Sequence, residues 1–175
     1  MTQTATHATQ VPRSRGWLGV VLRTRNTTRT VDLALVVARV ALAWIFFVYG
    51  AQKLFGWFNG PGLDPTADFM ADTAGLKPGS FFALVAGIIE FGGAIALALG
   101  LATRLAGLAL FVDMVMAMIT VTWSQGLHQA TLPGYELNVA LAGLALVVAL
   151  LGAGRYSADA GIEQRLGATG QGSDP

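Results

Sequence analysis

The sequence predicts an all-α membrane protein, a bundle of four transmembrane helices with the N-terminus and the C-terminus in the cytoplasm. Of its 175 residues, 54% are hydrophobic and only 12% are charged, whereas soluble domains average about 25% charged residues. Several long apolar runs each approach the roughly 20 residues that a helix needs to cross a bilayer. Turn-forming and polar residues separate these runs, which predict spans at 31–55, 80–101, 105–123 and 134–151.

The spans form one transmembrane domain, 31–152, between two polar tails. Residues 1–30 are rich in Thr, Gln and Arg, so we expect a basic, mostly disordered cytoplasmic tail there. The loop after the first span contains closely spaced Gly and Pro residues, and a short surface helix is expected at 65–74. The link 100–104 is short, which predicts an antiparallel hairpin of the second and third spans. Residues 153–175 are polar and predict a second cytoplasmic tail.

Basic residues predict the orientation of the spans, because cytoplasmic segments carry an excess of Lys and Arg. With the N-terminus inside, the inner side carries the five arginines of residues 1–30 together with Arg104, Arg155 and Arg165. The outer side then carries only Lys77, with Lys53 at its edge. Both termini are therefore expected in the cytoplasm.

The composition excludes several kinds of cofactor. The chain has no cysteine, which rules out disulfides, thiol redox chemistry, iron–sulfur ligation and covalently attached c-type haem. Its two histidines, His7 and His128, both lie outside the spans, and no metal-ligand spacing is present. We therefore expect no metal site and no covalently bound cofactor, so electron transfer would need a diffusible or partner-held carrier. The net charge of +1 argues against a nucleic-acid partner.

Five ionisable residues lie within the predicted spans. A charge at the centre of the bilayer costs about 2.5–3.5 kcal/mol on insertion scales, so such residues turn inward and pair. Glu90 lies in the middle of a stripe of small residues, which is the packing face of the second span. The five residues are Arg39 and Lys53 in the first span, Glu90 in the second, Asp113 in the third and Glu136 in the fourth.

Depth along each span suggests how these charges pair. At about 1.5 Å per residue, Arg39 and Asp113 lie at a similar distance from the cytoplasmic side, whereas Lys53 and Glu136 both lie near the outer boundary. We expect an inner pair Arg39–Asp113 and an outer pair Lys53–Glu136, with Glu90 either sharing Arg39 or protonated. Glu90, Arg39 and Asp113 form the candidate catalytic network, in which Glu90 relays protons or holds a polar substrate. The alternative is that these charges only orient the bundle through hydrogen bonds.

Other side chains on the first and fourth spans are candidates for substrate binding. Trp44 offers an aromatic face that a flat quinone ring can stack on. Lys53 and Glu136 also have an architectural interpretation, because a lysine near a helix end extends to the interface. The substrate-binding candidates are Gln52, Lys53, Glu136, Tyr49 and Trp44.

Sequence motifs along the spans resemble the DoxX family of small bacterial four-helix membrane proteins. An arginine early in the first span precedes YGAQKLFG at 49–56, and EFGG follows at 90–93. The pattern continues with LGLATR at 99–104, an acidic residue in the third span, Glu136, and GRYSAD at 154–159. The resemblance covers about 31–159, nearly all of the predicted folded part.

This resemblance implies a multi-pass protein of the bacterial inner membrane, similar to the DoxD-type subunit of thiosulfate:quinone oxidoreductase. Actinobacterial members of the family are associated with a membrane oxidoreductase complex that contains a superoxide dismutase and a sulfurtransferase and is linked to oxidative-stress resistance. The implied role is a partner-dependent subunit of such a complex in the lipid bilayer, with a quinone as cofactor. Two alternatives are a non-catalytic anchor or assembly factor for soluble redox enzymes and a small-molecule binding or transport module. A homo-oligomer is compatible with each role.

Overall fold

The computed structural model describes residues 28–127 and 134–170, and all regular structure within these ranges is helical, as predicted. Most of the predicted N-terminal tail and both histidines lie outside the described residues. The elements are α2 (Thr28–Phe55), α3 (Leu63–Asp72), α4 (Gly79–Leu99), α5 (Thr103–Ala117), the π-helical turn η1 (Met118–Thr122), the 3₁₀ turn η2 (Trp123–Gln125), α6 (Glu136–Leu151) and α7 (Ala158–Gly170).

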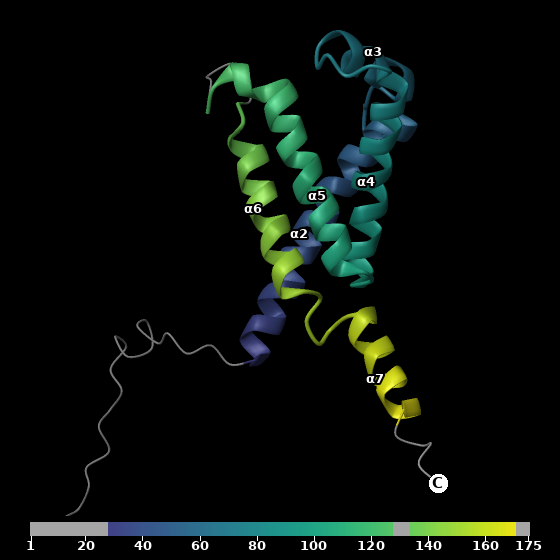
Figure 1. Ribbon diagram of the computed structural model, residues 1–175, viewed down its shortest axis with the longest axis vertical. Helices are drawn as coiled ribbons and strands as arrows, with labels where there is room; N and C mark the ends of the chain where they lie inside the picture. Colours follow the sequence, from purple (N-terminus) through teal and green to yellow (C-terminus); the bar gives the residue numbers. More distant parts are fainter. Residues whose placement is uncertain (1–27, 128–133, 171–175) are drawn as a thin grey trace, which may run out of the picture.

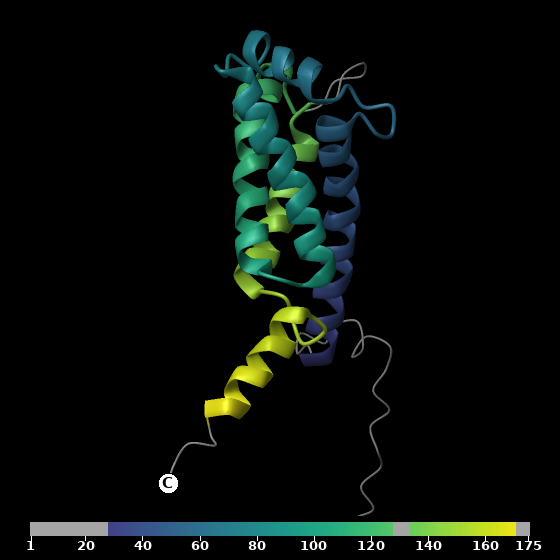
Figure 2. The same ribbon diagram turned by 90° about the vertical axis from the view of Figure 1, so that its right-hand side faces the viewer.

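The long helices α2, α4, α5 and α6 lie side by side as a bundle (Figures 1 and 2). α2 packs mainly on α4, and α5 packs mainly on α6, while α4 and α5 are joined by a tight turn. The short helix α3 lies across one end of the bundle, and α7 leaves from the other. These are called the α3 end and the α7 end below. The first described residues of α2 and the start of α7 lie at the same end, the α7 end (Figure 1).

Three of the helical segments are long and apolar enough to cross a membrane. These are α2 with 28 residues, α4 with 21 and the continuous segment Thr103–Gln125 with 23. α6 is also apolar but has only 16 residues. The expected surface helix at 65–74 is present as α3, which begins two residues earlier. The predicted C-terminal tail contains a further helix, α7, which the polar sequence did not indicate.

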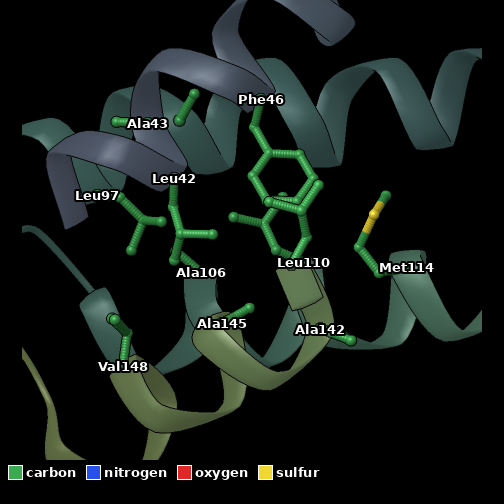
Figure 3. Packing of buried hydrophobic residues seen from close by; sticks show 12 residues of the cluster. Leu42, Ala43, Phe46, Leu97, Ala106, Leu110, Met114, Ala142, Ala145 and Val148 are labelled. Carbon is green, nitrogen blue, oxygen red and sulfur yellow. The ribbon is translucent and has the colours of Figure 1, made fainter. Parts of the chain in front are cut away.

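The apolar core fills the part of the bundle between its middle and the α7 end (Figure 3). Each long helix contributes small or branched side chains, and several are completely inaccessible to solvent. Because most residues outside this cluster face outward and are apolar, the bundle presents a lipid-compatible exterior. The fully buried members are Leu42, Phe46, Leu97, Leu110, Ala145 and Val148.

Glycine allows α2 and α4 to touch near the α3 end. A Cβ atom added to Gly50 would lie 2.4 Å from the backbone nitrogen of Phe91, so no larger residue fits there without moving a helix. Small residues at such crossings are typical of membrane helices because they let backbones approach closely. Lys53 lies one turn beyond Gly50, and Glu90 immediately precedes Phe91. The crossing therefore places this lysine beside this glutamate.

Candidate ligand-binding cavity

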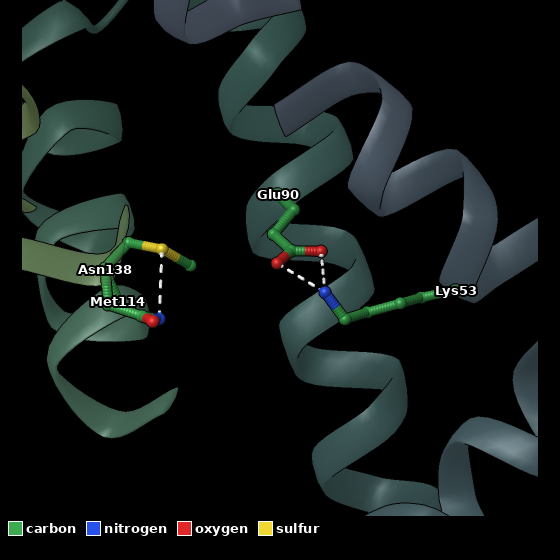
Figure 4. Close-up of polar contacts among 4 residues, drawn as sticks. All are labelled: Lys53, Glu90, Met114 and Asn138. Atoms are coloured by element: carbon green, nitrogen blue, oxygen red, sulfur yellow. Dashed lines mark hydrogen bonds and ion pairs between the residues drawn. The ribbon is translucent and has the colours of Figure 1, made fainter. Parts of the chain in front are cut away.

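Lys53 and Glu90 form an ion pair between α2 and α4 (Figure 4). The Lys53 Nζ atom lies 2.5 Å from each of the two Glu90 carboxylate oxygens. The Glu90 side chain is almost completely buried at 2% exposure, whereas the Lys53 side chain retains 24%. The pair satisfies the buried carboxylate and leaves part of the lysine accessible.

Asp113 of α5 completes a cluster of three ionisable groups. Its side chain lines the same cavity as Lys53 and Glu90 and interacts electrostatically with both. Two acidic groups and one basic group therefore meet at one place, and two neighbouring carboxyl groups can share a proton.

A cavity of about 280 Å³ opens beside this cluster. Its wall comes from all four long helices, and two side chains of α3 cover it from the α3 end. A second cavity of about 340 Å³ adjoins it and shares Tyr49, Lys53, Phe69 and Met70. The first cavity is lined by Tyr49, Lys53, Phe69, Met70, Ala86, Glu90, Asp113, Met114, Ala117, Val121, Thr122, Gly134, Leu137, Asn138 and Leu141.

The wall opposite the ion pair holds a second polar group that the sequence analysis missed. The Asn138 side chain of α6 accepts a hydrogen bond from the Thr122 hydroxyl at 3.3 Å. Its amide nitrogen donates to the Met114 sulfur at 3.9 Å (Figure 4). Thr122 ends the π-helical turn η1, a type of distortion that is frequent at functional sites. A polar residue within an otherwise apolar span was the signal available in the sequence.

Only some of the predicted binding residues reach this cavity. Tyr49 lines it, and Lys53 Nζ lies 5.7 Å from the centre of the Tyr49 ring. Gln52 lines the adjoining cavity and donates a hydrogen bond to the Phe58 carbonyl at 3.2 Å. Glu136 begins α6 and is not among the residues of either cavity wall.

Trp44 lies away from the charged cluster. Its side chain is 68% exposed and lines a separate, almost wholly apolar groove on the outside of α2 and α4. Trp44 therefore does not line the cavity beside Glu90, and its role in binding a quinone stays a prediction.

The predicted inner pair Arg39–Asp113 is also wrong. Arg39 donates hydrogen bonds to the carbonyl oxygens of Leu97 at 3.0 Å and Tyr156 at 3.2 Å, and to that of Ala153. The prediction measures the depth of Arg39 and of Asp113 from the start of the span that carries each. α2 projects beyond α4 and α5 at the α7 end, so equal depths in two spans do not correspond to the same level in the bundle (Figure 1). Arg39 is consequently level with the last turn of α4, whereas Asp113 lies well inside the bundle.

The predicted outer pair Lys53–Glu136 fails for a different reason. α2 packs on α4 far more extensively than on α6, so Lys53 meets Glu90 first. The close approach at Gly50 determines this choice of neighbour. Residue spacing gave the depth of each charge but not which helices are adjacent.

A second polar cluster lies at the α7 end and is called the clamp here. It consists of Arg39, Asp32, Asp159 and the connecting segment 153–157. The Asp159 carboxylate accepts hydrogen bonds from the backbone N–H groups of Ala102 at 2.8 Å and Thr103 at 3.0 Å, which begin α5. The Asp32 carboxylate accepts one from the backbone of Arg155 at 3.1 Å. These contacts tie the start of α7 to the turn between α4 and α5.

Burial and hydrogen bonding act in opposite directions on Asp159. Burial alone would raise its pKa, but the backbone N–H groups of Thr103 and Ala102 and the nearby Arg39 lower the pKa below its ordinary value. A polar cavity of about 590 Å³ adjoins the clamp. Although this cavity is larger, the charged groups of the clamp are mostly engaged with backbone, so the α3-end cavity is the stronger candidate site. Within the described ranges no cluster of His, Asp and Glu is placed to hold a metal ion.

Comparison with known proteins agrees with these features. The DoxX family profile matches residues 34–123, which include most of α2, all of α4 and α5, and the Lys53–Glu90–Asp113 cluster. The chain is 31% identical over 144 residues to the inner membrane protein YphA of Escherichia coli (strain K12), and the alignment covers 77% of this chain and 98% of YphA. No solved structure gave a significant match. The chain therefore belongs to the DoxX family and is a multi-pass protein of the bacterial inner membrane.

Proposed function

We propose that this protein is the membrane subunit of a quinone-linked oxidoreductase complex and that it binds a quinone head group in the α3-end cavity. The observation that carries the proposal is the cavity of about 280 Å³ whose wall contains Lys53, Glu90 and Asp113. Ionisable residues in membrane helices are costly, and they mark substrate sites and proton relays. Here three of them converge from three helices on one space.

The size of the cavity suits a ring rather than a whole lipid. Ligand pockets for drug-sized molecules usually enclose about 300–1,000 Å³. The cavity, at about 280 Å³, lies at the lower end of this scale and has room for one or two fused rings. The long apolar tail of a membrane quinone would extend out of the cavity. The adjoining cavity beside Gln52 and Phe69, which shares four lining residues with the first, offers further room next to it.

The residues of the cluster have the chemistry that quinone reduction needs from a protein. Conversion of a quinone to a quinol takes up two electrons and two protons. Lys53 is placed to donate a hydrogen bond to a carbonyl oxygen, which stabilises the negative charge that develops there on reduction. The carboxyl pair of Glu90 and Asp113 passes one proton to that oxygen, and the second proton comes from water that reaches the cavity from the α3 end. Both electrons come from a carrier held by a partner protein.

The same proposal includes four membrane spans with both termini in the cytoplasm. α6 rises only about 24 Å at 1.5 Å per residue, less than the roughly 30 Å of the hydrocarbon core, and bilayers thin locally around short spans. Arg29, Arg104, Arg155 and Arg165 belong to the α7 end, whereas Lys77 precedes α4 at the α3 end. This distribution favours the α7 end as the cytoplasmic side. Soluble redox enzymes, such as the superoxide dismutase and sulfurtransferase that the family resemblance suggests, would dock there.

The test is to recover the protein in native membrane discs and to measure its bound quinone by mass spectrometry. The variant Lys53→Met removes the donor, and Lys77→Met is the matched control because it makes the same change on an exposed residue outside both cavities. We expect wild type and Lys77→Met to retain quinone and Lys53→Met to retain at least about tenfold less, as for the loss of a charged hydrogen bond.

Other outcomes would favour the other roles. If wild type carries no quinone and does not bind an added one, the proposal is wrong. Recovery of soluble redox enzymes with wild type and Lys53→Met alike, without quinone, would indicate an anchor. Retention of a different small molecule that depends on Lys53 would indicate a binding or transport module.

A further inference from the structure

The α3-end cavity has hydrogen-bonding groups on two opposite sides. The Lys53–Glu90 pair projects from α2 and α4, and Asn138 and Met114 project from α6 and α5 toward the same space (Figure 4). Most of the wall between them is apolar. A ligand that fills the cavity therefore meets a polar group at each end.

On the first side, Lys53 keeps a donor for a ligand. An ammonium group has three N–H bonds, and the two Glu90 oxygens, each 2.5 Å from Nζ, account for two of them. The partial exposure of the lysine side chain leaves room for an acceptor at the third. The Glu90 carboxylate thus orients Lys53 and leaves one N–H bond of the ammonium group for a ligand.

On the opposite side, Asn138 presents an amide N–H that is only weakly satisfied. The Thr122 hydroxyl donates to the Asn138 oxygen, which fixes the amide so that its nitrogen faces Met114. A thioether sulfur is a weak acceptor, and the distance of 3.9 Å is long. A carbonyl oxygen entering the cavity would replace it as a better partner.

Resting on the proposed function, we propose that the cavity selects a ring with carbonyl groups at two opposite ends, a 1,4-quinone, and that Asn138 is its second binding residue. Lys53 donates to one carbonyl oxygen and the Asn138 amide to the other. The Met114 sulfur, displaced from the amide, contacts the ring, because a flexible and polarisable thioether adapts to the shape of an apolar surface. A molecule with one carbonyl group uses only the lysine side.

The test compares 1,4-naphthoquinone with 1-tetralone, which keeps one carbonyl group but lacks the second and the double bond between them. Equilibrium dialysis against the protein in lipid nanodiscs gives both affinities. We expect wild type to prefer the quinone by about three- to tenfold, the usual value of one neutral hydrogen bond. Asn138→Leu should lower quinone affinity by that factor and leave the affinity for 1-tetralone unchanged.

A second pair of variants keeps the test decisive if Asn138→Leu does not fold. Thr122→Val removes the hydroxyl that orients the amide, so the preference for the quinone should fall. Thr120→Val is the matched control, because Thr120 donates to the Met116 carbonyl at 2.8 Å and does not line the cavity. We expect this control to bind both ligands as wild type does.

The outcomes separate this inference from the proposed function. Equal affinities of wild type for the two ligands would overturn the role of Asn138 and leave quinone binding intact. The role of Asn138 would also be overturned if Thr122→Val and Thr120→Val preferred 1,4-naphthoquinone over 1-tetralone by the same factor. Absence of binding of either ligand to wild type would overturn the proposed function and this inference together.

Discussion

The protein buries charged residues at both ends of its helix bundle, and the two regions use them differently. In the clamp, Arg39 donates to the backbone carbonyl groups of three residues, one in α4 and two in the segment 153–157. In the α3-end cavity, Lys53, Glu90 and Asp113 interact with one another through their side chains. Both regions lower the cost of burying charge and both adjoin a cavity, but only in the α3-end cavity are the charged groups held mainly by other side chains rather than by backbone.

The kind of partner explains this difference. Backbone carbonyl groups cannot change rotamer, so the acceptors of Arg39 move only if α4 or the connecting segment 153–157 moves. Side chains on separate helices can change rotamer and exchange a proton without moving the backbone. A buried charge held by backbone is therefore suited to joining segments, whereas a buried charge held by other side chains is suited to binding and chemistry.

The substitution Arg39→Met should produce the largest loss of stability. It keeps most of the apolar stem but removes the guanidinium donor from the carbonyls of Ala153 and Tyr156, while the Leu97 carbonyl keeps a hydrogen bond from the Gly100 N–H group at 3.2 Å. Each buried polar group left unpaired costs about 1–3 kcal/mol, so we expect a loss on the order of 3 kcal/mol or more. Unfolding in mixed detergent micelles measures this loss.

The control for this prediction is Arg155→Met, because the Arg155 side chain is exposed and only its backbone bonds to Asp32. This control should change stability by less than about 0.5 kcal/mol, as exposed substitutions do. If Arg39→Met unfolds at the same detergent concentration as wild type, the clamp does not hold the bundle together and the contrast between the two regions disappears.

The substitution Gly50→Ala should affect the other region, with an intermediate effect on stability. The added Cβ atom would lie 2.4 Å from the backbone of Phe91, and backbone cannot rotate away. α2 and α4 must separate, which costs about 1–3 kcal/mol for an overpacked interface and moves Lys53 away from Glu90. Quinone binding should fall together with stability, as measured by dialysis and by unfolding.

Gly92→Ala is the matched control, because a Cβ atom at Gly92 meets nothing within 4 Å. Alanine is the better helix former, so this variant should be as stable as wild type or more stable. Wild-type stability and quinone binding in Gly50→Ala would show that the crossing does not position the ion pair.

The helices and the ionisable residues within them could be predicted from the sequence, but the contacts between these residues could not. Hydropathy and turn residues predicted α2, α4 and α5 to within a few residues, because membrane helices satisfy their own backbone and need few tertiary contacts to be recognised. Glu90 and Lys53 were both identified as candidates. Their partnership depends on the packing of α2 against α4 at Gly50, and periodicity within one helix contains no information about its neighbour.

The contacts of the clamp could not be predicted from the sequence, for a related reason. Arg39 was expected to pair with a carboxylate, since opposite charges are the partners that a sequence makes visible. Its actual acceptors are carbonyl groups, which every residue carries and no pattern distinguishes. Asp159 is fifty-six residues from Thr103 in the chain, and it caps a helix other than its own.

The smallest of these effects is expected from Asp159→Ala, and it depends on pH. Loss of the cap on the first N–H groups of α5 should cost about 1 kcal/mol at neutral pH. Hydrogen bonds from Thr103 and Ala102 and the nearby Arg39, acting against burial, lower the pKa of Asp159 in the folded protein. Its stabilising effect is therefore complete above the ordinary aspartate pKa of about 3.9 and is lost as pH falls through the lowered folded value.

The difference in stability between wild type and Asp159→Ala should consequently shrink as the pH of the unfolding experiment is lowered from 7 to 3. The α3-end cavity should be unaffected, because Asp159 and the cavity lie at opposite ends of the bundle, so quinone binding by this variant should match wild type at neutral pH. A stability difference that stays constant down to pH 3 would mean that the carboxylate charge is not what holds α7 to α5. Packing of the segment 153–157 would then be the main component of the clamp. Arg39 would be the one charged residue of the clamp that still distinguishes it from the α3-end cavity.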